Sequence, residues 1–172
     1  MILAVAVAAV WAALAMPLSY LLAATLLLGW TLCVLSAVDF LAFRLPDILT
    51  LPLVAIGLLL ALWLPERDII GHAIGAASGF LVLYLIATLY RQFRAREGLG
   101  LGDAKLAAAA GAWLGWQALP TVLLVASIGG LVWVSLATYF RGRSALNEQM
   151  PFGVPLCVAF WLEWLWVNGA LF

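Results

Sequence analysis

The stretch Glu97-Gly-Leu-Gly-Leu-Gly-Asp-Ala-Lys-Leu-Ala-Ala-Ala-Ala-Gly-Ala-Trp-Leu-Gly-Trp116 decides how this chain is organised. Its first nine residues are glycine-rich and charged, whereas the run from Leu106 to Trp116 is apolar. Asp103 lies where the two parts join, at the mouth of a predicted apolar helix. A carboxylate is expensive to keep in a membrane, so a residue in this place marks a candidate functional site that needs a partner.

Asp39 is the only comparable acid elsewhere in the sequence. It ends a long uncharged run, because residues 1–38 contain no Lys, Arg, Asp or Glu, and it precedes Phe40-Leu-Ala-Phe-Arg-Leu-Pro46. We therefore expect Asp39 and Asp103 to meet at one face of a membrane.

The composition excludes an ordinary water-soluble fold. Of the 172 residues, 67% are hydrophobic and 9% are charged, whereas soluble domains average roughly 45–50% and about 25%. The apolar runs are continuous, which favours helices over a barrel. We predict an all-α polytopic membrane bundle, with residues 1–172 forming a single membrane-embedded domain.

The same composition bounds the partners and cofactors. The formal net charge is zero and no basic patch occurs, so membrane lipids are expected neighbours and nucleic acid is not. Cys33 and Cys157 lie in apolar runs without a CxxC pattern, which predicts neither a metal site nor a disulfide.

About seven transmembrane helices (six to seven) are predicted, because a span needs about 17–25 apolar residues. Prolines break the longest runs, since they disfavour helix at the preceding residue. Two stripes of glycine four residues apart predict closely packed helices; they are Gly71, Gly75 and Gly79, and then Gly111 and Gly115. The predicted helices are 2–16 (short for a span), 18–38, 47–64, 69–90, 104–117, 120–140 and 151–170.

Basic residues set the expected orientation. Loops near 39–47, 91–103 and 141–150 fall on one side of the membrane, and Arg67 is the only basic residue on the other. Positive charge marks the cytoplasmic side, so the N-terminus and both aspartates are predicted there, at the cytoplasmic boundary. The basic residues on that side are Arg44, Arg91, Arg94, Arg96, Lys105, Arg141 and Arg143.

Two neighbouring aspartates suit peptide hydrolysis. Like charges a few ångströms apart cannot both ionise, so the pair shares a proton and titrates as a unit. One carboxylate can then activate water while the other protonates the leaving amine. Composition and spacing leave a plainer reading equally open, in which each aspartate ends a helix at the level of the lipid headgroups.

The residues around Asp103 and Asp39 carry their own alternatives. Gly98, Gly100 and Gly102 would let an extended substrate approach the backbone, or they form a plain linker. Lys105 either tunes Asp103 or meets headgroup phosphates. Pro46 and Asp47 fit the start of the next helix, and Asp47 is a possible support for the site.

Three segments together resemble a known family. Gly100-Leu-Gly-Asp103 fits the GxGD signature of intramembrane aspartic proteases, and the run 97–116 resembles the bacterial type IV prepilin peptidases. So does Asp39 followed by Arg44-Leu-Pro-Asp-Ile-Leu-Thr-Leu-Pro52. Pro151-Phe-Gly-Val-Pro155 resembles the family's segment before the last helix.

The resemblance implies a bacterial inner-membrane aspartic endopeptidase with its active site facing the cytoplasm. Such enzymes cut the short basic leader from type IV prepilins or type II secretion pseudopilins. Asp39 and Asp103 match the two catalytic aspartates, Gly100 and Gly102 match the active-site loop, and no metal or cofactor is implied. The sequence gives no oligomeric state.

One departure from the family concerns methylation. Many members carry an N-terminal segment with paired CxxC motifs, tied to zinc and to N-methylation of the new N-terminus. This sequence begins after the place of that segment, so a peptidase-only short form is expected.

Three rival interpretations stay open on the sequence. One is a small transporter or assembly subunit that uses Asp39 and Asp103 as ion sites, and another is a degenerate peptidase kept as a scaffold. Presenilin-like enzymes also use GxGD, but they have Tyr before the first aspartate and a Pro-Ala-Leu motif. Here Val38 precedes Asp39 and no Pro-Ala-Leu occurs.

Overall fold

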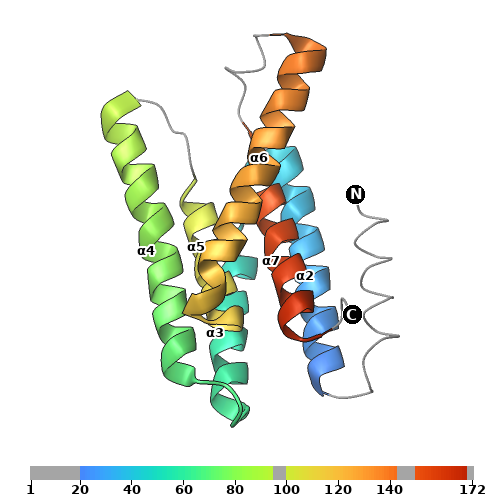
Figure 1. Ribbon diagram of the computed structural model, residues 1–172, viewed down its shortest axis with the longest axis vertical. Coiled ribbons are helices and arrows are strands. Elements are labelled where there is room, and N and C mark those ends of the chain that lie inside the picture. Colours follow the sequence, from blue (N-terminus) through green and yellow to red (C-terminus); the bar gives the residue numbers. More distant parts are fainter. Residues whose placement is uncertain (1–19, 95–99, 143–149, 170–172) are drawn as a thin grey trace.

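The computed structural model describes residues 20–94, 100–142 and 150–169, which form helices joined by short connections, with no strand among them (Figure 1). The helices are α2 (Tyr20–Ala42), α3 (Asp47–Trp63), α4 (Ile69–Arg94), α5 (Leu101–Leu114), the 3-10 turn η1 (Trp116–Ala118), α6 (Leu119–Arg141) and α7 (Gly153–Val167). The all-α prediction is confirmed. The predicted helix 2–16 lies outside the described residues.

Local sequence sets most helix ends. Pro46 precedes α3 in an extended conformation (φ −72°, ψ 133°), and the Asp68 carboxylate accepts from the N–H groups of Ile70 and Gly71 at 3.0 and 3.1 Å, which caps α4. Gly115 (φ +84°) ends α5 and Gly142 (φ +78°) ends α6, since glycine tolerates positive φ.

The predicted end of the second helix at residue 38 is wrong. Helix α2 continues to Ala42, so Asp39 lies in its last turn rather than beyond it. The helix ends where Phe43 adopts a positive φ of 52°, and the Phe43 N–H donates to the carbonyl oxygen of Asp39 at 2.8 Å. The carboxylate of Asp39 is therefore carried by helical backbone.

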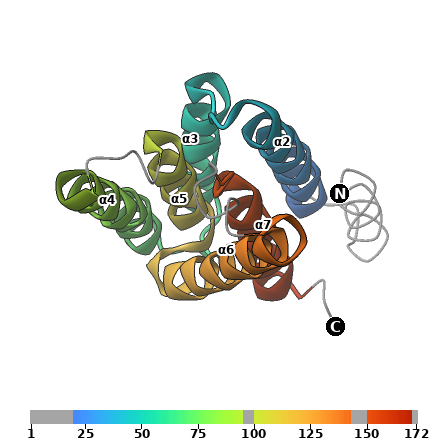
Figure 2. The same ribbon diagram turned by 90° about the horizontal axis from the view of Figure 1, so that it is seen from above.

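Helix α5 is the centre of the bundle. It contacts α3, α4, α6 and α7, which surround it in the view along the bundle (Figure 2). Apart from Lys105, its residues from Asp103 to Leu114 are buried. With 14 residues it is about 21 Å long, shorter than a hydrocarbon core of about 30 Å. Helix α5 is thus enclosed by longer helices.

The glycine stripes do bring α4 and α5 into close contact, as predicted. A Cβ added at Gly75 would lie 2.6 Å from the carbonyl oxygen of Gly111, and one at Gly79 would lie 2.5 Å from that of Ala107. The two backbones touch directly, so small residues are required on both helices.

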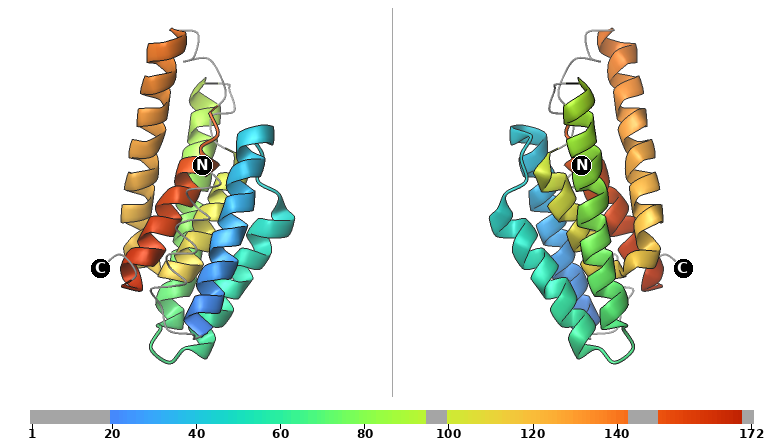
Figure 3. Two further views of the ribbon diagram at one scale, coloured as in Figure 1. Left: turned by 90° about the vertical axis from the view of Figure 1, so that its right-hand side faces the viewer. Right: turned by 90° about the vertical axis from the view of Figure 1, so that its left-hand side faces the viewer.

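This contact also fixes the depth of Asp103. Asp103 is one turn before Ala107, which places it level with about Leu83 on α4. Helix α4 continues from there to Arg94, a further rise of about 16 Å. Figures 1 and 3 show α4 and α6 extending past the start of α5. Asp103 therefore lies well below the end of α4 that carries Arg91, and its position at the cytoplasmic boundary stays a prediction.

The outer surface fits a membrane protein. Three helical segments are long and apolar enough to cross a bilayer, Leu21–Ala42, Ile69–Gln92 and Trp116–Arg141, and α3 and α7 are shorter apolar helices. Large apolar side chains such as Trp30, Ile48 and Trp63 are exposed on the outside. The helical membrane bundle is confirmed, and the number of spans stays a prediction.

Replacing Gly75 with alanine should destabilise the bundle, because the new Cβ would meet backbone atoms of α5 that cannot move away. We expect the free energy of unfolding, from denaturation in detergent, to fall by about 1–3 kcal/mol. Gly129→Ala is the matched control, since its Cβ would make one close contact, 3.2 Å to Pro155 Cβ, that a shift of a few tenths of an ångström relieves, and both changes gain the same helix propensity. Equal stability of the two variants would contradict the close α4–α5 contact.

Candidate active site

The structure brings Asp39 and Asp103 together inside the bundle. Asp39 comes from the last turn of α2 and Asp103 from the first turn of α5. Their exposed fractions are 5% and 7%, and the charge of Asp39 acts on the carboxyl group of Asp103. Two buried acids close enough for the charge of one to act on the other can share a proton.

Asp39 faces the first turn of α7. The backbone N–H groups of Val154 and Gly153 interact with its carboxylate. Its Oδ2 atom is buried and has no hydrogen-bond partner among the described residues. Buried polar atoms are rarely left unpaired, and the exceptions often serve catalysis. The described residues thus leave one buried oxygen of the Asp39 carboxylate without a hydrogen bond.

Asp103 is held by its own helix start. Its Oδ2 accepts from the backbone N–H of Gly100 at 3.2 Å, and its own N–H donates to the Gly100 carbonyl oxygen at 3.2 Å. The carboxylate of Asp103 thus satisfies an N–H group that α5 would otherwise leave without a partner. The start of a helix also favours negative charge.

Leu45 fills the space between the two helix starts. It belongs to the connection from α2 to α3 and is 8% exposed. A Cβ added at Gly102 would lie 2.7 Å from Leu45 Cβ, and one at Gly153 would lie 3.1 Å from Leu45 Cδ1. The sequence analysis did not predict this place for Leu45, because no feature of the sequence marks Leu45 as part of the site. It also assigned no role to Gly153, although Gly153 lies in the segment 151–155 that carries part of the family resemblance.

The glycines before Asp103 have different places. Gly100 is the N-cap of α5 and is exposed. Gly102 lies inside the first turn of α5 and packs against Leu45, so its missing side chain makes room for the protein's own chain. Gly98 lies outside the described residues. The predicted open loop therefore ends earlier than the sequence suggested.

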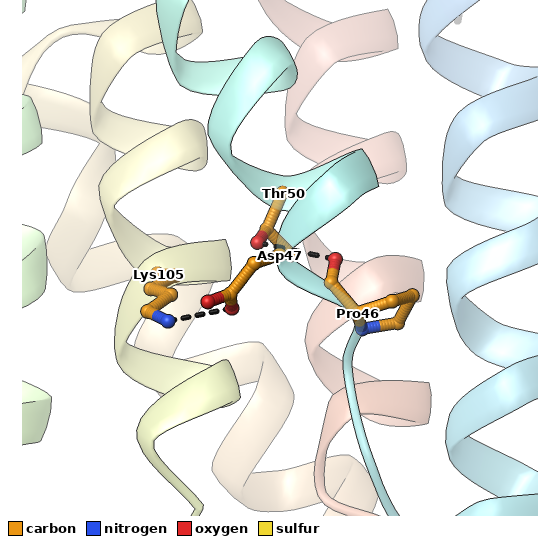
Figure 4. Close-up of polar contacts among 4 residues, drawn as sticks. All are labelled: Pro46, Asp47, Thr50 and Lys105. Atoms are coloured by element: carbon orange, nitrogen blue, oxygen red, sulfur yellow. Dashed lines mark hydrogen bonds and ion pairs between the residues drawn. The ribbon is translucent and has the colours of Figure 1, made fainter.

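Lys105 binds Asp47 (Figure 4). The Lys105 Nζ atom lies 2.5 Å from Asp47 Oδ1, and the two side chains are 26% and 58% exposed. Beside this pair the Thr50 hydroxyl donates to the Pro46 carbonyl oxygen at 3.4 Å. The described partner of Lys105 is thus Asp47 at the start of α3, and the pair links α3 to α5 near the two aspartates.

The described residues contain no group of three or more His, Cys, Asp or Glu side chains that could hold a metal ion. What they bring together is a pair of carboxylates and the backbone N–H groups of two helix starts. This set can bind, donate and accept protons.

Comparison with known proteins decides the family. The model of the type IV leader peptidase family matches residues 26–135, which include both aspartates. The chain belongs to the type IV leader peptidase family. The resemblance read from the GxGD stretch is therefore confirmed.

Curated relatives of this chain carry the name prepilin leader peptidase/N-methyltransferase. The Burkholderia pseudomallei (strain K96243) protein is 46% identical over 122 residues, covering 71% of this chain and 39% of the relative. The Aeromonas salmonicida protein is 42% identical over 146 residues, covering 83% and 49%. The Dickeya chrysanthemi protein is 41% identical over 165 residues, covering 90% and 55%. The chain thus spans about half the length of these relatives, and no solved structure matches it.

The Lys105–Asp47 pair should contribute modestly to stability. Because both side chains are partly exposed, water screens their attraction, and we expect a coupling energy below about 1 kcal/mol. A double-mutant cycle with Asp47→Asn and Lys105→Gln measures it, since the separate effect of Asp47 on the start of α3 cancels in the cycle. Exchanging the two residues, Asp47→Lys with Lys105→Asp, should keep the coupling. Strict additivity of the single changes would contradict the pair.

Proposed function

We propose that this protein is a membrane aspartic endopeptidase that cleaves the leader from type IV prepilins or type II secretion pseudopilins. The observation that carries the proposal is the meeting of Asp39 and Asp103, two buried carboxylates whose charges interact. Membership of the type IV leader peptidase family supports it. So do the names of relatives that are 41–46% identical.

The reaction follows from the two carboxylates sharing one proton. The ionised aspartate takes a proton from water, and the water oxygen attacks the carbonyl carbon of the scissile peptide bond. The protonated aspartate gives its proton to the leaving nitrogen, and the C–N bond breaks. The products are the leader with a new carboxylate and the mature chain with a new amine. The proton taken from water restores the shared-proton state of the pair.

We place the active site at the cytoplasmic end of a bacterial inner-membrane protein. The starts of α3, α5 and α7 and the ends of α2, α4 and α6 lie at the end of the bundle that carries the aspartates. Most basic residues in the described part of the chain lie there too, which fits the positive-inside rule. Arg67 lies at the opposite end, where it donates to the Trp113 carbonyl oxygen at 2.9 Å.

The substrate in this proposal presents its leader junction from the membrane. A prepilin leader is short and basic and is followed by an apolar helix. That helix can lie beside the bundle, because the outer faces of α4 and α6 are apolar and exposed. The junction must then reach Asp39 and Asp103 below the ends of these two helices. An extended stretch of substrate is required for this step.

Replacing either aspartate should abolish cleavage. Asp39→Asn and Asp103→Asn each remove an acid or a base, and general acid–base groups contribute roughly 10²–10⁴-fold. We expect purified protein in detergent to cleave a prepilin substrate, and each variant to lose at least about 100-fold in kcat. Asp68→Asn is the control, because Asp68 caps α4 at the far end.

Two outcomes would contradict the proposal. One is a wild-type protein that is inert towards several prepilins and pseudopilins. The other is a variant, at Asp39 or at Asp103, that cleaves as fast as the wild type. Either result would favour the alternative in which the two aspartates form an ion site. Ion-flux measurements on the same two variants test that alternative.

A further inference from the structure

The first turn of α7 contacts the candidate active site, and the proposed reaction assigns no role to it. Its residues belong to the segment Pro151-Phe-Gly-Val-Pro155, and α7 begins at Gly153. We propose that this turn is a third part of the catalytic centre, in which Gly153 is a positioning residue that lets backbone N–H groups of α7 hold the Asp39 carboxylate. The inference rests on the proposed function for its catalytic meaning, but its physical content is a contact between Asp39 and α7.

The first step in the argument is the closeness of Gly153 to Asp39. A Cβ added at Gly153 would lie 2.7 Å from Asp39 Oδ2 and 2.9 Å from Asp39 Cγ, closer than real Cβ atoms come to other heavy atoms. On its other side it would meet Leu45 Cδ1 at 3.1 Å. Only glycine lets the α7 backbone come this near to the carboxylate. Any side chain must push Asp39 or α7 away.

The second step is the chemistry of a helix start. The first N–H groups of a helix lack intrahelical partners and carry partial positive charge, which favours an anion. The N–H groups of Val154 and Gly153 interact with Asp39. The remaining hydrogen bond of the Val154 N–H, to the Pro151 carbonyl oxygen, is long at 3.3 Å. These groups therefore stabilise the ionised form of a carboxylate that is otherwise buried among apolar side chains.

The third step is the rigidity of α7 against α2, the helix that carries Asp39. The Trp164 Nε1–H donates to the Thr25 hydroxyl oxygen at 3.0 Å. One turn further along α2, a Cβ added at Gly29 would lie 2.9 Å from the Trp161 ring. Together with the Gly153 contact, these interactions fasten the two antiparallel helices along their length. The start of α7 thus has a fixed position relative to Asp39.

The sequence allows a direct test of the contact by NMR. Gly153-Val154 is the only Gly–Val pair and Phe152-Gly153 the only Phe–Gly pair in the chain. Labelling one residue of a pair with carbonyl ¹³C and the next with ¹⁵N therefore isolates a single amide. In Asp39→Asn we expect both amide protons to move upfield, because each loses a charged acceptor. Asp68→Asn, at the far end of the bundle, should leave them in place. Amides that respond no more to Asp39→Asn than to Asp68→Asn would overturn the proposal.

The catalytic meaning is tested with Gly153→Ala. Displacing a catalytic group by about 1 Å can cost 10²-fold, so we expect kcat to fall about 100-fold while KM stays close to that of the wild type. Gly130→Ala is the matched control, because its Cβ would meet the flexible end of Met150 at 2.9 Å and make an ordinary contact of 3.8 Å with the Phe152 ring. A Gly153→Ala protein that keeps the kcat of the Gly130→Ala protein would overturn the positioning role.

These two tests separate the inference from the proposed function. If the wild type does not cleave, the proposed function fails, and the amide shifts still decide whether α7 holds Asp39. If Gly153→Ala does not fold, the NMR comparison needs only Asp39→Asn and Asp68→Asn. If the wild type cleaves but the amide shifts do not respond to Asp39→Asn, the peptidase proposal is supported and the proposed role of α7 is wrong.

Discussion

Two carboxylates inside an apolar helical bundle are the constraint on which the rest of this structure depends. An isolated buried charge is very costly, and a pair of like charges is worse unless they share a proton. The bundle meets this cost with backbone groups, because Gly100 donates to Asp103 and the start of α7 faces Asp39. Glycine is needed at 153, where a Cβ would lie 2.7 Å from Asp39 Oδ2, whereas a Cβ at Gly100 would make an ordinary contact of 3.7 Å with Asp103 Oδ2.

The helix lengths follow from the same constraint. Helix α5 is short and enclosed, which puts Asp103 below the ends of α4 and α6 rather than at their rim. Alanine and glycine along α5 let α4 pack against its backbone. At the opposite end, the Arg67 guanidinium lies 5.0 Å from the centre of the Trp164 ring and binds the Trp113 carbonyl oxygen, so the short helix is also fixed from below. The site is thus held by contacts at both ends of the bundle.

Sequence reasoning predicted the six described helices and the close glycine contact because both depend on local patterns of apolar and small residues. It found the two aspartates because charge is rare in this chain. It missed the end of α2, since nothing in the composition marks the positive φ of Phe43. The sequence also could not predict the contacts made by Leu45 and Gly153, or the pairing of Lys105 with Asp47. Their roles arise only when the connection after α2 and the starts of α3, α5 and α7 come together in space.

The central claim is that Asp39 and Asp103 face each other in the membrane-embedded protein. The most direct measurement is cross-linking of cysteines placed at 39 and 103, in a variant with Cys33→Ser and Cys157→Ala, using a short bifunctional reagent in lipid nanodiscs with mass-spectrometric detection. The account predicts a cross-link between 39 and 103, and none between 39 and a cysteine at Ala110, two turns deeper in α5. A 39–103 pair that stays unlinked under conditions that modify both cysteines would contradict it.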